Sequence, residues 1–196
     1  MKKFINPLIV GAVIAVVTAG CASAPSRFYT LNSTTTADGS TTANYAIAVG
    51  PVTVPAAVDR PQITIRVGPN RVAVDEFNRW AEPLSQNIAR VVAANLATML
   101  GTPRVASSPL ANFNPDYRVA INIQQFESVP GGSVTVEALW VVLKPAGSVS
   151  LSGQTVASEP VSGNDYDALA AAHSRALTKV SSDIAAAIRS EAGEKP

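Results

Sequence analysis

The hydrophobic period of this chain changes along its length, and the order of the changes limits the folds it can adopt. In the first half, apolar and polar side chains alternate as they do in half-buried strands. The segments with this pattern are 27–31, 45–55, 62–67 and 71–77. From Pro83 to Leu100 the apolar residues recur instead at helical spacing, and Gly101 marks the end of a helix of about 27 Å. The first half therefore predicts strands followed by one long helix.

The second half of the sequence repeats that order. Strand-like segments occupy 117–126, 133–144 and 148–158, and Gln124-Gln125 shifts the alternation as a β-bulge would. Asp165 is a suitable N-cap for a final helix. The apolar stripe of that helix comprises Leu169, His173, Leu177, Val180, Ile184 and Ile188. An order of strands, helix, strands, helix predicts an α+β domain, with a mainly antiparallel sheet and two helices packed on one face.

The only cysteine, Cys21, closes an apolar run that begins after Lys2 and Lys3. A positive start, an apolar stretch and small residues before a cleavage point are typical of a signal peptide. A transmembrane helix would need about 20 apolar residues, whereas this run is shorter and contains Pro7. A plain secretory signal would end in an A-x-A-like site and would not need a cysteine.

Small residues followed by cysteine resemble the lipobox of bacterial lipoproteins, although Thr18 stands where that motif usually has leucine. The resemblance implies that the signal is cut before Cys21 and that the thiol is acylated. Ala22, rather than aspartate, follows the cysteine, and the sorting rule of these signals then implies the outer membrane, facing the periplasm. We thus expect a signal peptide at 1–20, a lipidated tether at 21–26, a single periplasmic domain at 27–191 and a frayed tail at 192–196.

Charge and composition argue against several classes of function. Lys and Arg number 15 against 14 Asp and Glu, with no basic run, so nucleic-acid binding is not expected. The chain has one histidine and one cysteine, too few for a cysteine metal cluster or a His-based metal site. His173 lies on the stripe of the last helix, where a structural role is expected. We therefore predict no enzyme activity, no cofactor and no metal.

The most distinctive part of the sequence is rich in Pro, Arg and Trp and covers 49–66 and 77–84. Prolines should keep the first of these segments extended. Asp59 and Arg60 are expected at a turn. The residues of these two segments do not form a catalytic motif. They therefore either support the fold or form a binding surface.

The residues just before the long helix have several possible roles. Glu82 would favour the positive end of that helix and pair with Arg79. Trp80 would either pack beneath the loop or face a partner, because Trp and Arg are enriched at interface hot spots. The solvent side of the helix is expected to carry Gln86, Asn87 and Arg90.

These motifs resemble those of the ABC-type transport auxiliary lipoproteins, the PqiC-like family. The likeness lies in the lipobox at Cys21 and in "FYTL" (28–31), "VGPVTVP" (49–55), "VDRPQITIR" (58–66) and "RWAEPL" (79–84). It implies an outer-membrane lipoprotein that works with an MCE-domain protein in carrying lipids between two membranes, as a non-catalytic docking component. The positions it marks as candidate partner-binding residues are Asp59, Arg60, Pro61, Arg79, Trp80, Glu82 and Pro83. The sequence leaves open whether the protein forms a homo-oligomer.

An alternative function is a stand-alone lipoprotein that carries a lipid in its own apolar cavity. It predicts that Ile121, Val136 and Trp140 face an open pocket. The docking hypothesis predicts a filled core and an exposed patch around Arg79 and Trp80. A third hypothesis, attachment to the cell wall, has no supporting motif in the sequence.

Overall fold

The computed structural model describes residues 24–36, 43–108, 111–144 and 149–193. The predicted signal peptide and the predicted lipidation site Cys21 lie outside these residues, as do the last three residues of the predicted tail. Neither helix of the described part combines the length and the apolar character needed to cross a membrane.

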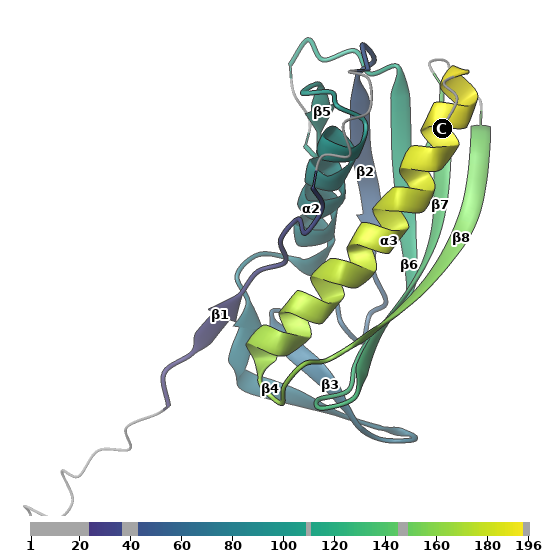
Figure 1. Cartoon of the computed structure of the whole chain (residues 1–196). Helices are drawn as coiled ribbons and strands as arrows, with labels where there is room; N and C mark the ends of the chain where they lie inside the picture. The colour runs from purple at the N-terminus through teal and green to yellow at the C-terminus, as the bar shows by residue number, and fades with distance from the viewer. Residues whose placement is uncertain (1–23, 37–42, 109–110, 145–148, 194–196) are drawn as a thin grey trace, which may run out of the picture.

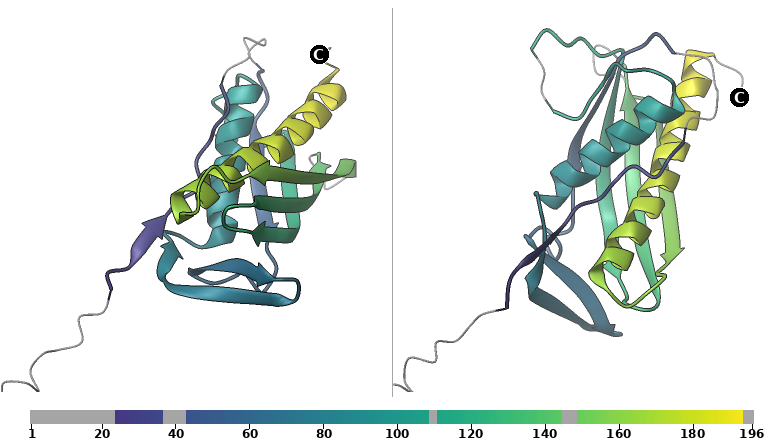
Figure 2. Two further views of the ribbon diagram at one scale, coloured as in Figure 1. Left: turned by 60° about the horizontal axis from the view of Figure 1, so that its bottom comes forward. Right: turned by 60° about the vertical axis from the view of Figure 1, so that its left-hand side comes forward.

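The described chain forms two β-sheets and two helices (Figures 1 and 2). The small sheet has the order β1-β4-β3 and the large sheet the order β5-β2-β6-β7-β8. The strands are β1 (Arg27–Tyr29), β2 (Ile47–Thr53), β3 (Gln62–Gly68), β4 (Arg71–Trp80), β5 (Val105–Ala106), β6 (Tyr117–Ser128), β7 (Ser133–Leu143) and β8 (Val149–Pro160). The helices are α2 (Leu84–Met99) and α3 (Tyr166–Ala192). The predicted α+β class and the order of elements are confirmed.

Strand directions are more mixed than the expected mainly antiparallel sheet. β6, β7 and β8 form an antiparallel meander and β3 and β4 an antiparallel hairpin. β2, however, runs parallel to both β5 and β6, and β1 runs parallel to β4. The reason is that the chain leaves β2 through the hairpin and α2 before it returns as β6, and such a crossover connects parallel strands. Alternating side chains indicate a strand but not its direction.

Both helices cover the same face of the large sheet, as predicted (Figure 1). α2 contacts β2 and α3, while α3 contacts β7 and β8. The predicted stripe of α3 is buried along its whole length, and so are the inward residues of β7. Each large apolar side chain buried there contributes roughly 1.5–3 kcal/mol to folding. The predicted bulge also occurs, because the β6–β7 register shifts between Ile123 and Gln125.

The helix ends follow the sequence signals. Pro83 precedes the first turn of α2, and Gly101 after its end has a φ of 61°, a left-handed conformation that glycine adopts without strain. The Asp165 side chain accepts a hydrogen bond from the Ala168 backbone N–H (2.8 Å) and so caps α3.

Candidate functional site

Three of the sequence motifs meet where the small sheet joins α2. Tyr29 of β1 pairs with Trp80 at the end of β4. The Trp80 backbone N–H donates to Pro61 O (2.7 Å), and the Ala81 N–H donates to Tyr29 O (2.8 Å). Segments more than 50 residues apart are thereby tied together around Trp80. In Figure 1 this junction lies at the end of the molecule where the chain enters β1.

Trp80 is part of the core, with 5% of its surface exposed. Its ring stands edge-on to Phe126 and to His173, at centroid distances of 6.2 and 6.5 Å. The exposed patch predicted around Trp80 is therefore wrong for the tryptophan itself, because the small sheet folds its inner face onto β6 and α3. Of the two roles that the sequence left open for Trp80, packing is the one the structure has.

His173, for which the apolar stripe predicted a half-buried structural position, is fully buried. It stacks on Phe126 with a ring separation of 3.9 Å, and its Nε2 shares a hydrogen bond of 2.8 Å with Ser128 Oγ. Nδ1 has no hydrogen-bond partner within the described residues. Burial lowers the pKa of His173 to about 3, because a charged imidazolium would be poorly solvated there.

Four of the predicted partner-binding residues are exposed: Asp59, Arg60, Pro61 and Pro83. We call them the motif patch. The first three lie on a turn fixed by its own backbone, in which the N–H groups of residues 58 and 59 donate to Pro55 O (3.0 and 3.1 Å). The turn therefore presents a carboxylate and a guanidinium side by side on a rigid support.

The predicted ion pair between Arg79 and Glu82 is wrong. Arg79 instead lies near Glu76 (3.8 Å) and donates from Nε to the Glu76 backbone oxygen (2.8 Å). Glu82 pairs with Arg90, whose Nη2 lies 2.9 Å from Glu82 Oε1. The reason is a turn in β4, where Asp75 Oδ1 accepts the N–H groups of residues 77 and 78 and brings Arg79 back toward Glu76. Glu82, beyond the strand, faces α2.

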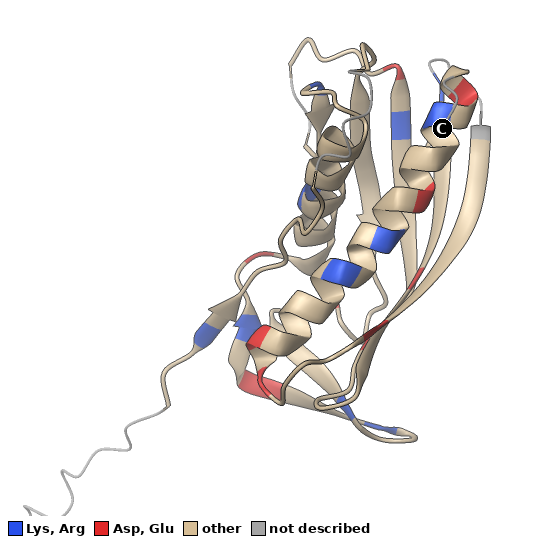
Figure 3. Cartoon of the chain, viewed as in Figure 1, with Lys and Arg blue, Asp and Glu red and all other residues tan. Residues whose placement is uncertain are grey.

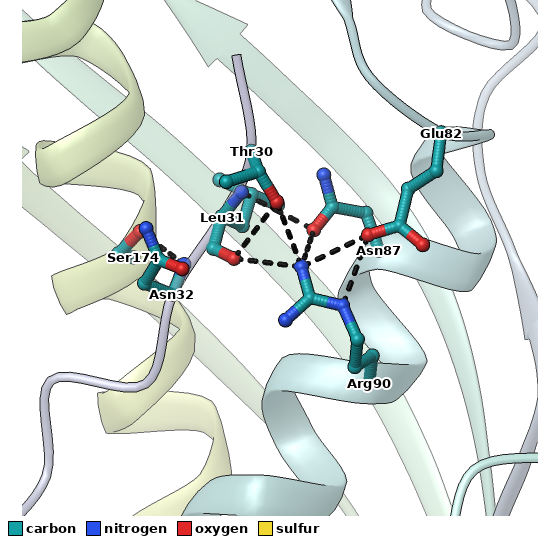
Figure 4. A network of polar contacts seen from close by, with 7 residues as sticks. All are labelled: Thr30, Leu31, Asn32, Glu82, Asn87, Arg90 and Ser174. Atoms are coloured by element: carbon teal, nitrogen blue, oxygen red, sulfur yellow. Dashed lines mark hydrogen bonds and ion pairs between the residues drawn. The ribbon is translucent and has the colours of Figure 1, made fainter.

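Residues 30–34, which we call the strap, run from β1 across α2 and α3 on the side away from the large sheet (Figure 2, right). Arg90 holds the start of the strap (Figure 4): its Nη2 donates to Thr30 Oγ1 (2.8 Å), Leu31 O (2.9 Å) and Asn87 Oδ1 (2.8 Å). Asn87 Oδ1 also accepts the Leu31 N–H (3.2 Å). Asn87 is thus buried beneath the strap and not on the solvent side, which corrects the expectation for this residue.

Polar side chains of both helices hold the remainder of the strap. The Asn32 N–H donates to Ser174 Oγ (3.1 Å), and the Ser33 hydroxyl donates to Asn95 Oδ1 (2.6 Å). Asn95 Nδ2 in turn donates to Ser181 Oγ (3.0 Å). This set of buried polar side chains was not predicted from the sequence. Its signal was present, because buried Asn and Ser side chains interrupt otherwise apolar stripes at helical spacing.

Replacing Arg90 with alanine should release the start of the strap and lower the free energy of unfolding by about 1–2 kcal/mol. The estimate takes hydrogen bonds to a charged group and discounts them because 43% of the Arg90 side chain is exposed. Hydrogen exchange of the Leu31 amide should rise at the same time. The matched control is Lys179→Ala, which removes an exposed i,i+4 pair with Asp183 (2.8 Å) and should cost about 0.5 kcal/mol or less. Equal effects of the two changes would contradict the assigned role of Arg90.

The interior is packed at the positions where a lipid cavity was considered. Ile121, Val136 and Trp140 are 2%, 0% and 8% exposed. A hollow of about 270 Å³ reaches Ile121 and Trp140, but from the outer side of the sheet, where Asn122 and Leu139 are exposed. These three side chains are part of the packed core, whereas the carrier hypothesis predicts that they face an open inner pocket.

A larger groove, of about 530 Å³, lies between β2 and the start of α2. Residues 49–52 of the "VGPVTVP" motif line it, together with Ser85 and Gln86 of α2 and Phe113 of the loop between β5 and β6. Gly50 has a φ of 133°, which requires glycine, and the Gly50–Pro51 peptide bond is cis. Among the described residues no group of three His, Cys, Asp or Glu side chains could hold a metal ion.

Comparison with protein families gives a match for the model described as "ABC-type transport auxiliary lipoprotein component", over residues 29–185. The chain belongs to this family. The match begins at the last residue of β1 and ends within α3, so the family resemblance of the motifs is confirmed for the described domain. The auxiliary lipoproteins are transport components, which is the class of function that the resemblance implied.

Solved structures share the fold of this auxiliary lipoprotein. A crystal structure of protein XCC0632 from Xanthomonas campestris, of family DUF330, has a TM-score of 0.71 and 22% identity, covering 86% of this chain and 97% of that one. A crystal structure of an uncharacterized protein has a TM-score of 0.69 and 20% identity, covering 84% of this chain and 99% of that one. A comparison with curated proteins found no match.

Proposed function

We propose that this protein is a non-catalytic, outer-membrane lipoprotein subunit of an MCE-type system that moves lipids between two membranes. Its role is to dock the periplasmic MCE tunnel at the outer membrane. The single observation that supports docking over carriage is the packed core beneath a rigid, exposed motif patch. A carrier needs an interior cavity for its ligand, whereas a docking subunit needs a surface held in one geometry.

The motif patch has the properties of a specific docking surface. Arg60 and Asp59 are exposed on a turn whose backbone is already fixed, so little conformational entropy is lost when a partner binds. Arginine is among the residues that contribute most at interfaces. The buried Trp80 supports the patch through the core, and the partly buried Glu82 supports it through Arg90.

Anchoring is part of the same proposal. Acylation of Cys21 with more than one chain would give stable attachment, since a single chain binds membranes only marginally. Membership of a lipoprotein family supports this attachment, and Ala22 supports sorting to the outer membrane. The first experiment is affinity purification of the lipidated protein from envelope membranes, with Cys21→Ser as the control.

Replacing Arg60 with glutamate should lower recovery of the MCE-domain protein about tenfold, because like charges placed across an interface cost several kcal/mol and 1.4 kcal/mol is a factor of ten. Recovery is measured by quantitative mass spectrometry of the purified complex. The matched control is Arg104→Glu, an equally exposed arginine beside β5, which lies far from the small sheet (Figure 1).

Two outcomes would overturn the docking role. The first is undiminished recovery of the MCE-domain protein with Arg60→Glu, or an equal loss with Arg104→Glu. The second is recovery of stoichiometric bound lipid with no MCE-domain protein from the unaltered chain. The second result would make the protein a carrier in its own right.

A further inference from the structure

The outer face of the small sheet carries exposed apolar side chains, although Phe28 borders a hollow beside α3 and Val72 a hollow beside β6. Tyr29 and Trp80 pair across β1 and β4, and both side chains point into the core. Because side chains alternate along a strand, their neighbours Phe28 and Arg79 point outward. Phe77 lies two residues before Arg79, within the irregular part of β4, and is also exposed.

The same face continues across the hairpin. Gln62 of β3 pairs with the outward residue Arg79, and alternation along β3 places Thr64 and Arg66 on the same side, although the β3–β4 register shifts between Gln62 and Thr64. The Arg66 guanidinium reaches Glu127 of β6 from there. Thr64 pairs with Val74 and Arg66 with Val72, and paired residues share a face. The outward apolar set is therefore Phe28, Val72, Val74 and Phe77, which we call the apolar face.

The exposure of these side chains is unusual for this protein. Phe28 is 64% exposed, Val72 57%, Phe77 43% and Val74 36%. Seven large hydrophobic side chains of the described residues are exposed rather than partly or fully buried, and four of them lie in this apolar set. Single exposed apolar residues need no explanation, but a cluster on one sheet face indicates an interaction surface.

The position of the face relative to the predicted anchor indicates its partner. The segment from Cys21 to Arg27 can span at most about 20 Å, at about 3.6 Å per residue. β1 is part of the small sheet, and the strap binds the following residues to α2 and α3. β1, and with it the small sheet, therefore stays within about 20 Å of the proposed anchor, and Figures 1 and 2 show the chain entering the fold beside this sheet.

Charge around the face fits a phospholipid surface. Arg27 and Arg71 are exposed at its edges, and neither makes an ion pair within the described residues. The nearby acids are Glu76, which lies 3.8 Å from Arg79, Asp75, which accepts from the Tyr166 hydroxyl of α3 (2.8 Å), and Asp167, which lines a hollow with Phe28. Figure 3 shows blue segments on β1 and on the hairpin. Apolar side chains bordered by unpaired arginines match an apolar lipid interior beneath anionic headgroups.

We propose that the apolar face lies on the membrane surface and inserts into the headgroup layer, as a second contact beside the lipid anchor. The proposal rests on the anchor of the proposed function, but not on the MCE partner. The face then fixes the orientation of the whole domain, because the strap makes β1 rigid with the helices. The motif patch adjoins this face through the Trp80–Pro61 bond, so a docked partner would be held close to the membrane.

The test uses the lipidated full-length mature protein in vesicles of phosphatidylethanolamine and phosphatidylglycerol that contain a nitroxide-labelled lipid. Cys21 is the only native cysteine and is blocked when acylated, so one introduced cysteine accepts one bimane label. We expect the label at Val72→Cys to be quenched at least twofold more than the label at Val156→Cys. Val156 is the matched control, since it is a valine of similar exposure (61%) on β8 of the large sheet.

A third label, at Ser26→Cys in the tether, separates the two proposals. Quenching at Ser26 without extra quenching at Val72 would overturn membrane contact while leaving the anchor intact. Loss of quenching at all positions would overturn the anchor and this proposal with it. Phe28→Glu should lower the Val72 signal to the level of Val156 without changing recovery of the MCE-domain protein. A concentration-dependent blue shift at Val72 in detergent alone would instead assign the face to a second copy of the chain and overturn membrane contact.

Discussion

Replacing Gly153 with valine should lower the free energy of unfolding by about 3 kcal/mol, the upper part of the range for overpacked cores. Gly153 lies directly opposite Trp140 in the β7–β8 pair, and the indole ring occupies the space where a side chain would be. A Cβ added at 153 would be 2.3 Å from Cζ2 of the Trp140 ring and 2.7 Å from Cη2, distances that van der Waals repulsion does not allow.

The Trp140 ring cannot easily move aside. Its Nε1–H donates to Thr155 Oγ1 (3.1 Å), and the Thr155 hydroxyl donates to Asp183 Oδ2 on α3 (2.7 Å). Rotation of the indole would break this chain and leave buried polar atoms without partners, which adds to the cost. Equilibrium urea unfolding followed by tryptophan fluorescence measures the effect.

Gly68→Val is the matched control, because a Cβ at 68 would meet only Arg71 Cβ, at an ordinary 3.7 Å. It should cost less than about 1 kcal/mol. In the double variant Trp140→Leu, Gly153→Val, the two losses should be clearly less than additive. Equal costs at 68 and 153, or fully additive losses, would mean that Trp140 does not determine the need for glycine.

Most elements of the fold could be predicted, because the burial period of a strand or helix is a local property. The alternating residues of β7 and the stripe of α3 are buried as their spacing requires. The helix ends could be predicted for the same reason, because Asp165 and Gly101 act on residues next to them in the sequence. The pairing direction of β2 was not predictable, because it depends on how the intervening hairpin and α2 are placed.

The candidate site was only partly predictable for the same reason. Turn residues such as Asp59 and Arg60 are exposed as their chemistry suggests. The burial of Trp80 and the ion pair of Glu82 could not be predicted, because they depend on contacts with β6, α3 and Arg90 that the local sequence does not indicate. The strap is the extreme case, since Asn32 and Ser174 are 142 residues apart.

The strap gives the domain a mechanical property that its elements alone would not have. A lipid anchor on a free tether would leave the domain able to tumble above the membrane. Here the residues just after β1 are bonded to α2 through Asn87 and to α3 through Ser174. The orientation of β1 is therefore fixed relative to both helices. In the proposed docking role, this connection would link the anchored segment to both helices.

Acid should destabilise the protein through His173, over a pH range in which few other groups titrate. In the folded state burial lowers the pKa of His173 to about 3, from 6.5 for a free side chain. Between these values the unfolded chain binds a proton that the folded chain does not. The free energy of unfolding should thus be flat above pH 6.5 and fall below it, by up to about 1.4 kcal/mol per pH unit. If the full pKa difference is realised, the loss at pH 3 approaches about 5 kcal/mol.

The pH 4.5–6.5 window isolates this effect because the chain has one histidine and carboxyl groups titrate mainly near pH 4. Asp75 and Asp183, whose pKa values hydrogen bonds hold below 3.8 despite burial, add losses only at still lower pH. Urea unfolding at half-unit steps of pH measures the slope. His173→Gln can keep a hydrogen bond to Ser128 and cannot titrate, so it should be less stable at pH 7.5 but lose the slope between pH 6.5 and 4.5. The same slope in both proteins would show that His173 is not the group that takes up the proton on unfolding. The neutral imidazole stacked on Phe126 would then not limit stability in acid.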